Sequence, residues 1–351
     1  MHNWPRGSSG RSRNVGNFDI GRGLNAWYEN NRVFSGGAGG GGTSMALAYD
    51  PLAAGPKAQI VDRSLRVSSD REIPVRIFLP AGSDAAPVLL FSHGLGGSRE
   101  TSNFLGHHWA SRGYVCVFLQ HPGSGVEVWK GKKPVEAMAA LKSAASRREL
   151  LARIGDVKGS LDALARLNSS GTNPLKGRFD LDHVGMSGHS FGAMTTQAVS
   201  GQRGGTPASP RWETDPRIDS ALPMSPSPVK GVDPAFSFGN VRIPWLLMTG
   251  TDDGAPSGIV DIEPSDRVKV YPALPPGDKY QLVLDGGEHM AFTEGRMRFQ
   301  KKSQNPNHHR VILATSTAFW DATLRDDEAA KQWLRARARE VMEPGDRWSW
   351  K

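Results

Sequence analysis

The sequence of 351 residues has a single cysteine, Cys116, and no long run of apolar residues. One thiol excludes an internal disulfide, and because Cys116 lies in the apolar stretch 114–119 we expect it to be buried rather than reactive. No stretch is apolar and long enough to span a membrane, and the start lacks the apolar region of about 7–15 residues that a signal peptide needs. These absences predict a cytoplasmic protein. Secretion or a periplasmic location is the alternative if the true start or a leader is missing.

Internal repeats and nucleic-acid-binding motifs are also absent from the sequence. The formal net charge is +8, but the basic residues are scattered and are not interleaved with aromatic residues. This pattern indicates a solvated basic surface and not a nucleic-acid site. Anionic surfaces or lipid head groups are the alternative partners of such a charge.

The first 45 residues differ in composition from the rest. They include the glycine-rich run 36–42 and few residues that could build a core, which predicts a flexible tail. Residues 46–351 are enough for a single large α/β domain with a substantial core.

Apolar strand patterns alternate with helical patterns through that domain. The expected strands are 71–79, 87–92, 114–120, 181–187, 218–224, 243–250 and 279–284. The expected helices include 101–112, 146–167 and 305–324. This alternation predicts a mostly parallel sheet of about eight strands with helices on both faces. Two stretches, 123–145 and 201–216, interrupt the alternation and are expected to be small cap or rim elements beside a cleft, or plain surface excursions.

One strand-to-helix corner carries the most informative motif. Residues 188–192 read GHSFG, the G-x-S-x-G pattern of a nucleophile elbow, with Ser190 at its centre. The two glycines allow a turn so tight that the serine hydroxyl projects from the end of the sheet, and the same turn aims the Phe191 N–H at a developing oxyanion. A strand pattern precedes the motif and a helical one follows it, in the required order. We therefore predict that Ser190 is a nucleophile.

A serine nucleophile needs a base, and the base needs a third group that holds its tautomer. In this arrangement an acid and then a histidine follow the serine along the chain, each on a loop after a later strand. The strand 243–250 runs into Asp252 and Asp253, and the strand 279–284 is followed by His289. We predict His289 as the base and Asp253, three residues after the glycine that closes its strand, as the acid. Asp252 is the alternative.

Other histidines fit the role of base less well. His107 and His108, like His308 and His309, are adjacent residues in expected helices and do not share a helix face, so neither pair predicts a metal site. Surface or capping roles are expected for these four. His121 follows a strand but precedes the serine, against the expected order.

The second oxyanion donor is expected in the loop after the strand 87–92. Residues 93–98 read HGLGGS, and the glycines on both sides of Leu95 let its backbone approach a substrate. The Leu95 N–H would then pair with that of Phe191. The alternative is an ordinary glycine-rich turn into the next helix.

The motifs FSHGLG at 91–96 and GHSFG at 188–192 together resemble the platelet-activating-factor acetylhydrolase and predicted dienelactone-hydrolase-like branch of the α/β-hydrolases, from about Tyr49 to Arg347. Bacterial polyester hydrolases are similar in plan. The resemblance implies the α/β-hydrolase fold and assigns roles within it. The implied roles are nucleophile for Ser190, acid for Asp253, base for His289, and oxyanion donors for Leu95 and Phe191. True dienelactone hydrolases have a cysteine nucleophile where this chain has serine, so their substrate is not implied, and the first 45 residues match nothing in the family.

From these residues we expect a serine carboxylic-ester hydrolase that works through an acyl-enzyme without a metal or organic cofactor. The resemblance favours short acyl groups on small-molecule or lipid-like esters. Polyester or aryl-ester hydrolysis and acyl transfer to an alcohol are alternatives that use the same residues. A catalytically silent binding protein with this fold is the alternative from another class.

Overall fold

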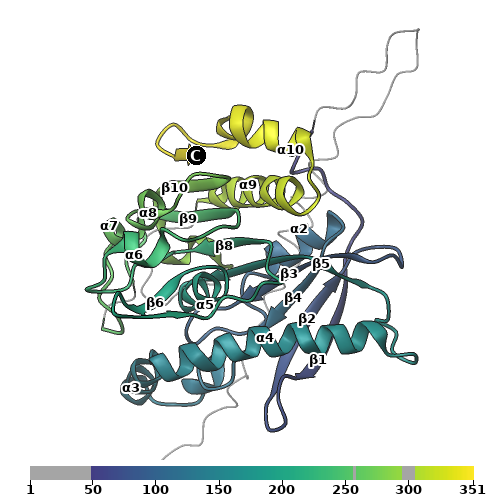
Figure 1. Cartoon of the computed structure of the whole chain (residues 1–351), viewed down its shortest axis with the longest axis horizontal. Coiled ribbons are helices and arrows are strands. Elements are labelled where there is room, and N and C mark those ends of the chain that lie inside the picture. The colour runs from purple at the N-terminus through teal and green to yellow at the C-terminus, as the bar shows by residue number, and fades with distance from the viewer. Residues whose placement is uncertain (1–48, 256–257, 295–304) are drawn as a thin grey trace, which may run out of the picture. The chain divides into compact units, whose positions relative to one another are not determined.

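The computed structural model describes residues 49–255, 258–294 and 305–351, and its centre is a nine-stranded sheet (Figure 1). The described residues belong to one compact unit of the chain, Ala48–Lys351. The expected flexible tail, residues 1–45, lies outside the described residues. The sheet runs in the order β1-β2-β4-β3-β5-β8-β9-β10-β11.

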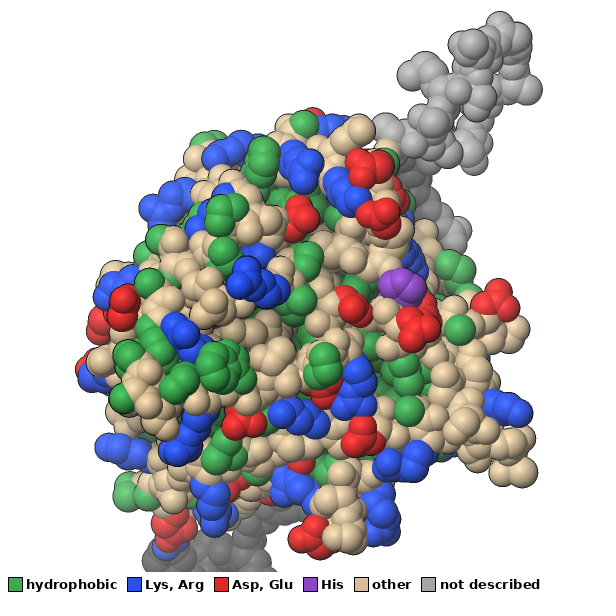
Figure 2. Space-filling model, in the orientation of Figure 1, with side chains coloured by type: hydrophobic (Ala, Val, Ile, Leu, Met, Phe, Trp, Pro, Cys, Tyr) green, Lys and Arg blue, Asp and Glu red, His purple; other side chains and the backbone are tan. Residues whose placement is uncertain are grey.

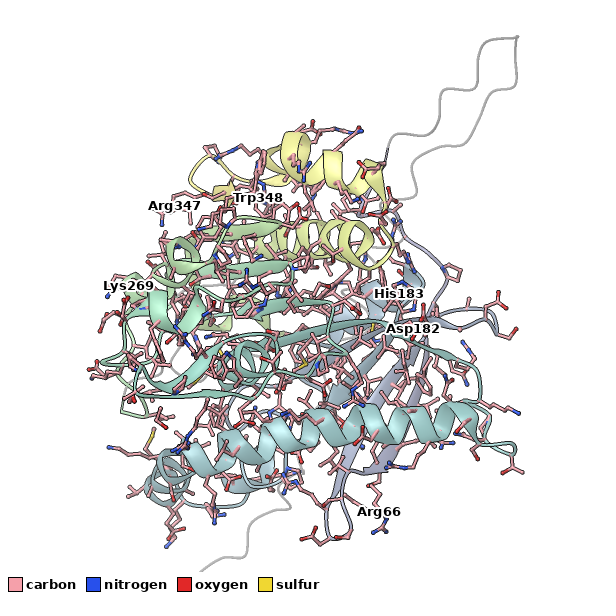
Figure 3. All side chains as sticks on the ribbon, viewed as in Figure 1. Arg66, Asp182, His183, Lys269, Arg347 and Trp348 are labelled. Atoms are coloured by element: carbon pink, nitrogen blue, oxygen red, sulfur yellow. The ribbon has the colours of Figure 1, made fainter. Side chains whose placement is uncertain are left out.

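The strands of this sheet are β1 (Gln59–Arg66), β2 (Glu72–Leu79), β3 (Ala86–Ser92), β4 (Val115–Leu119), β5 (Phe179–His189), β8 (Ser220–Met224), β9 (Trp245–Asp252), β10 (Lys279–Glu288) and β11 (Arg347–Trp350). Within the run β4-β3-β5-β8-β9-β10 all neighbouring strands pair parallel. β1, β2 and β11 pair antiparallel at the two borders. Figure 3 labels Arg66 at the end of β1 and Arg347 and Trp348 on β11, toward these opposite borders. The prediction of a mostly parallel sheet is confirmed, with nine strands where about eight were expected.

Helices cover both faces of the sheet (Figure 1). They include α2 (Asn103–Ser111), α3 (Pro134–Ala144), α4 (Arg147–Ser169), α5 (Phe191–Val199), α6 (Pro234–Phe238), α7 (Pro264–Arg267), α8 (Val270–Ala273), α9 (Pro306–Leu324) and α10 (Glu328–Gln332). Because successive strand residues point to opposite faces, Leu89 and Phe91 of β3 join a core cluster with α2 and α9. The intervening Val88 and Leu90 join a second cluster with α4. The central strands are therefore buried on both sides and read as continuous apolar runs.

Both interruptions contain small elements of their own. The stretch 123–145 forms a short 3₁₀ turn (Val126–Val128) and α3, in which only Ala144 is buried. The stretch 201–216 contains a separate hairpin of β6 (Arg203–Thr206) and β7 (Ser209–Trp212).

Cys116 lies fully buried in β4, and burial raises the pKa of its thiol well above the usual range. Among the described residues, no helix is long and apolar enough to cross a membrane. On the face shown in Figure 2, basic side chains are spread among acidic ones and do not gather into one patch. This distribution agrees with the interpretation of the net charge as a solvated surface.

Candidate active site

Ser190 stands at the corner between β5 and α5 in a backbone conformation that side chains rarely adopt, with φ 59° and ψ −115°. The flanking glycines allow two close backbone approaches. A Cβ on Gly188 would lie 2.4 Å from the carbonyl oxygen of Gly192, and one on Gly192 would lie 1.8 Å from that of Ser92. A strained serine held by glycines on both sides is the geometry of a nucleophile elbow.

The structure brings Ser190, His289 and Asp253 into one hydrogen-bonded chain. Asp253 follows β9, and His289 follows β10, so all three lie at the carboxyl ends of parallel strands. The Ser190 Oγ lies 2.8 Å from His289 Nε2, and His289 Nδ1 lies 2.6 Å from Asp253 Oδ1. A carboxylate only accepts, so Nδ1 carries the proton and Nε2 is left with a lone pair toward the serine hydroxyl.

Asp253, and not its neighbour Asp252, contacts the histidine. Asp253 is fully buried, and Thr249 Oγ1 donates to its second carboxylate oxygen at 2.8 Å. The buried Arg267 donates from Nε to the Asp253 carbonyl at 3.2 Å. Desolvation favours the neutral acid, but the hydrogen bond from His289 and the charges of His289 and Arg267 outweigh it and lower the pKa of Asp253. Asp252 is the last residue of β9 and is exposed.

His189, inside the elbow motif, has a role that the sequence did not reveal. Its buried Nε2 donates to the backbone carbonyl of His289 at 2.8 Å, and the two rings lie 4.7 Å apart. Burial, with the nearby His289 as a smaller cause, lowers the pKa of His189 to about 3. His189 is therefore neutral and holds the loop that carries His289.

The loop after β3 approaches the elbow as expected. A Cβ on Gly94 would lie 3.3 Å from the Ser190 Cβ, so the peptide that leads to Leu95 is close to the serine. Within the described ranges, the N–H groups of Leu95 and Phe191 donate to no protein acceptor. Two unused N–H donors beside a strained serine can bind a negatively charged oxygen.

Of the four histidines expected in surface or capping roles, three are used differently. His108 and His308 are buried and donate to the carbonyls of Pro51 and Asp285, at 3.0 and 3.1 Å. The half-buried His309 stacks on Phe104. Among the described residues, no group of three or more His, Cys, Asp or Glu side chains is arranged to hold a metal ion.

Comparison with known proteins gives two similarities. Residues 65–129, which contain the loop after β3, match the family model of platelet-activating factor acetylhydrolase, isoform II. The cutinase est2 of Thermobifida alba is 23% identical over 239 residues, a region that covers 68% of this chain and 64% of the cutinase. The match thus spans less than two thirds of the length of that relative. The strand order and the serine elbow are those of the α/β-hydrolase fold, and the chain is similar to an acetylhydrolase family and to a cutinase.

Proposed function

We propose that the protein is a serine carboxylic-ester hydrolase that works through an acyl-enzyme. The observation that carries this proposal is the unbroken hydrogen-bonded chain from the Ser190 hydroxyl through His289 to the buried Asp253 carboxylate. Such a chain activates a hydroxyl that is otherwise a poor nucleophile. It also argues against the alternative of a catalytically silent binding protein, because binding alone does not require an aligned triad.

The reaction follows from the placement of the protons. His289 Nε2 takes the proton of Ser190 as its Oγ bonds to the ester carbonyl carbon, and the carbonyl oxygen becomes an oxyanion bound by the N–H groups of Leu95 and Phe191. His289 then gives the proton to the departing alcohol, which leaves an acyl group on Ser190. A water molecule, deprotonated by His289, attacks this acyl group, and the proton returns to Ser190 as the acid leaves. Asp253 stabilises the imidazolium in both halves.

Short acyl groups are the proposed substrates. The match of residues 65–129 to an acetylhydrolase family supports this choice, because that stretch contains the Leu95 loop. Hydrolysis of polyesters or aryl esters is the second candidate, and the similarity to a cutinase favours it. A steep loss of kcat/KM beyond about four acyl carbons would support a tight acyl pocket, whereas activity on long chains and on polyester films would support the second candidate.

The test compares hydrolysis of p-nitrophenyl acetate, butyrate and octanoate by the wild type and Ser190→Ala. The matched control is Ser187→Ala, which removes a buried hydroxyl of the same strand that donates to the Leu90 carbonyl. We expect Ser190→Ala to lose activity by several orders of magnitude and Ser187→Ala to keep the wild-type rate within a few-fold. Near-normal turnover by Ser190→Ala would contradict the assignment.

A further inference from the structure

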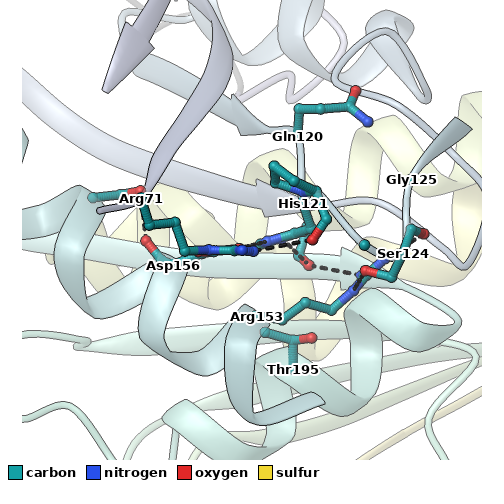
Figure 4. A network of polar contacts seen from close by, with 12 residues as sticks. Arg71, Gln120, His121, Ser124, Gly125, Arg153, Asp156 and Thr195 are labelled. Carbon is teal, nitrogen blue, oxygen red and sulfur yellow. Dashed lines mark hydrogen bonds and ion pairs between the residues drawn. The ribbon is translucent and has the colours of Figure 1, made fainter. Parts of the chain in front are cut away.

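A fully buried cation contacts the loop after β3, residues 93–98, which we call the oxyanion loop. Arg153, on α4, has no solvent exposure, and it forms no ion pair with any carboxylate in the described part of the chain. Its Nε donates to Ser124 Oγ at 2.8 Å (Figure 4). Its Nη1 donates to the His93 carbonyl at 2.6 Å. Desolvation lowers the pKa of Arg153 to about 9, which leaves it charged at pH 7. A buried charge without an ion-pair partner destabilises the folded state. Arg153 is therefore expected to have a role other than stability.

The carbonyl of Gly94 receives three hydrogen bonds from this region. His93 Nδ1 donates to it at 2.7 Å, the Gly97 N–H at 3.0 Å and Arg153 Nη2 at 3.5 Å. The His121 N–H donates to His93 Nε2, which leaves Nδ1 as the protonated nitrogen of that ring. This carbonyl belongs to the same peptide unit as the Leu95 N–H, and the two point in opposite directions across a trans peptide. The donors that hold the Gly94 oxygen therefore orient the Leu95 N–H.

The same guanidinium also contacts the other proposed donor residue. It lies over the Phe191 ring, 4.4 Å from the ring centroid. In addition, Arg153 Nη2 donates to the Ser124 carbonyl at 3.2 Å, and this carbonyl accepts the Gly96 N–H at 2.9 Å. One side chain thus connects the loop after β3, the loop after β4 and the start of α5.

A second buried network supports this arrangement without neutralising Arg153. Asp156, one turn after Arg153 on α4, accepts from Arg71 and from His121 Nδ1 (Figure 4). His121 Nε2 lies 2.9 Å from Ser92 Oγ. Burial lowers the pKa of His121 to about 4, so it is neutral at pH 7. Asp156 pairs with Arg71 and attracts Arg153 only from a greater distance, as do Glu149 and Glu127, so Arg153 carries its positive charge beside the oxyanion loop without a direct ion-pair partner.

We propose that Arg153 is a positioning residue for the oxyanion hole: it fixes the Gly94–Leu95 peptide and the Phe191 residue and adds a buried positive charge behind both donors. This inference rests on the proposed function, since it names what orients the groups that bind the oxyanion. A preorganised donor acts on the transition state more than on the bound substrate. Loss of Arg153 should therefore reduce kcat and leave KM nearly unchanged.

The experiment uses Arg153→Gln, Arg153→Lys and the milder Ser124→Ala, which removes one hydrogen bond and leaves the guanidinium in place. The matched control is Arg203→Lys, because Arg203 also donates to a backbone carbonyl and lies over a phenylalanine ring, on β6, beyond the far end of α5. Each variant is measured for kcat and KM on p-nitrophenyl acetate and for inhibition by an alkyl boronic acid, which forms a tetrahedral adduct with an active serine. Labelling with a fluorophosphonate counts the active sites, and thermal unfolding reports the folded fraction.

We expect Arg153→Gln to lower kcat per labelled site by about 10- to 100-fold, to leave KM within about three-fold, and to weaken boronic acid binding by a factor similar to the loss in kcat. Arg153→Lys keeps the charge and should recover part of this loss, Ser124→Ala should lose less than Arg153→Gln, and Arg203→Lys should match the wild type.

If the Arg153 and Ser124 variants show the wild-type kcat and inhibitor affinity per labelled site, this inference is overturned and the proposed function stands. If the Arg153 variants fail to fold, an unchanged kcat and inhibitor affinity in Ser124→Ala would also overturn it. A wild type that neither hydrolyses the esters nor reacts with the fluorophosphonate would overturn the proposed function and this inference together.

Discussion

Asp252 and Asp253 are adjacent carboxylates whose surroundings differ. Asp253 is buried and accepts from His289 and Thr249, whereas Asp252 is exposed. Because the hydrogen bond from His289 and the nearby charges lower the pKa of Asp253, its carboxylate is ionised throughout the neutral range. An ionised acceptor at this position keeps the proton of His289 on Nδ1 and leaves Nε2 free to accept from Ser190.

Replacing Asp253 by asparagine should reverse that tautomer. In Asp253→Asn the amide N–H can donate to His289 Nδ1, which moves the ring proton to Nε2 and removes the acceptor for the serine proton. We expect kcat for p-nitrophenyl acetate to fall by about 10³- to 10⁴-fold, the scale reached when the acid of a Ser-His-Asp triad is changed to its amide. Asp252→Asn removes the same charge one residue earlier and should stay within a few-fold of the wild type. Equal losses in both variants would contradict the placement of the acid.

Ser190, Asp253 and His289 could be proposed from the sequence because the elbow motif has a fixed form and its partners follow in a fixed order. The groups that orient them could not, because they arrive through tertiary contacts from distant segments. His189 and Arg153 are two such groups, and they differ in how much the sequence indicates about their contacts. His189 lies within the motif, but nothing in the motif says that its ring holds the His289 carbonyl.

For Arg153, the residue pattern of α4 indicates that the side chain belongs to an internal polar network. The apolar stripe of α4, formed by Ile154, Val157, Leu161 and Leu164, runs beside polar residues at the same helical spacing, namely Glu149, Arg153, Asp156 and Ser160, and all eight are buried. Polar residues repeated at the period of a buried face indicate an internal network, not a solvated surface.

At the scale of elements, the stretch 123–145 packs against the oxyanion loop. Trp129 Nε1 donates to the Gly96 carbonyl at 2.7 Å, and a Cβ on Gly96 would meet the side chains of Trp129 and Leu141. Beyond this contact the stretch exposes apolar side chains, with Val135 82% and Met138 44% accessible. An element anchored to this loop and apolar on its outer side favours the expected rim element over a plain surface excursion.

Trp129 should therefore influence both the loop and the preference for acyl length. Trp129→Ala removes the hydrogen bond to Gly96 and an apolar surface, so kcat/KM should fall for all p-nitrophenyl esters, and more for butyrate and octanoate than for acetate. Trp129→Phe keeps an aromatic ring without the N–H and should lower kcat/KM for the three esters by a similar factor. Trp212→Ala on the β6–β7 hairpin removes another exposed indole as a control. An unchanged ratio between octanoate and acetate in Trp129→Ala would exclude the rim role.

The strand pattern predicted the central elements and β2 and missed the two outermost strands, β1 and β11. β3, β4, β9 and β10 are buried on both faces, so their continuous apolar runs were visible in the sequence. β1 is mostly exposed, and β11 has four residues, of which only Trp348 is buried. Short or solvated edge strands have little apolar pattern, because one side of their pairing and much of their surface faces water.

For the molecule as a whole, the buried histidines link stability to pH. Burial is the main cause that lowers the pKa of His93, His108, His121 and His189, to about 4 for His108 and His121 and about 3 for His189. In the unfolded chain these rings bind protons below about pH 6.5, whereas in the folded protein they do so only at much lower pH. The unfolded state then binds more protons, so the free energy of unfolding falls as the pH drops from about 6.5 toward 4, by up to about 1.4 kcal/mol per pH unit for each ring.

His108 allows this linkage to be tested away from the serine, because it lies on α2 and donates to the Pro51 carbonyl while its Nδ1 has no partner in the described structure. His108→Gln keeps a donor but cannot titrate, so between pH 7.5 and 5.5 it should lose about 1 kcal/mol less of its unfolding free energy than the wild type. Urea unfolding at both pH values measures the difference. Trp109→Phe, which loses the buried hydrogen bond to Ser316, should be destabilised at both pH values and keep the wild-type pH dependence. If His108→Gln instead follows the wild type between the two pH values, the His108 ring is already protonated in the folded protein, and burial does not exclude its charge.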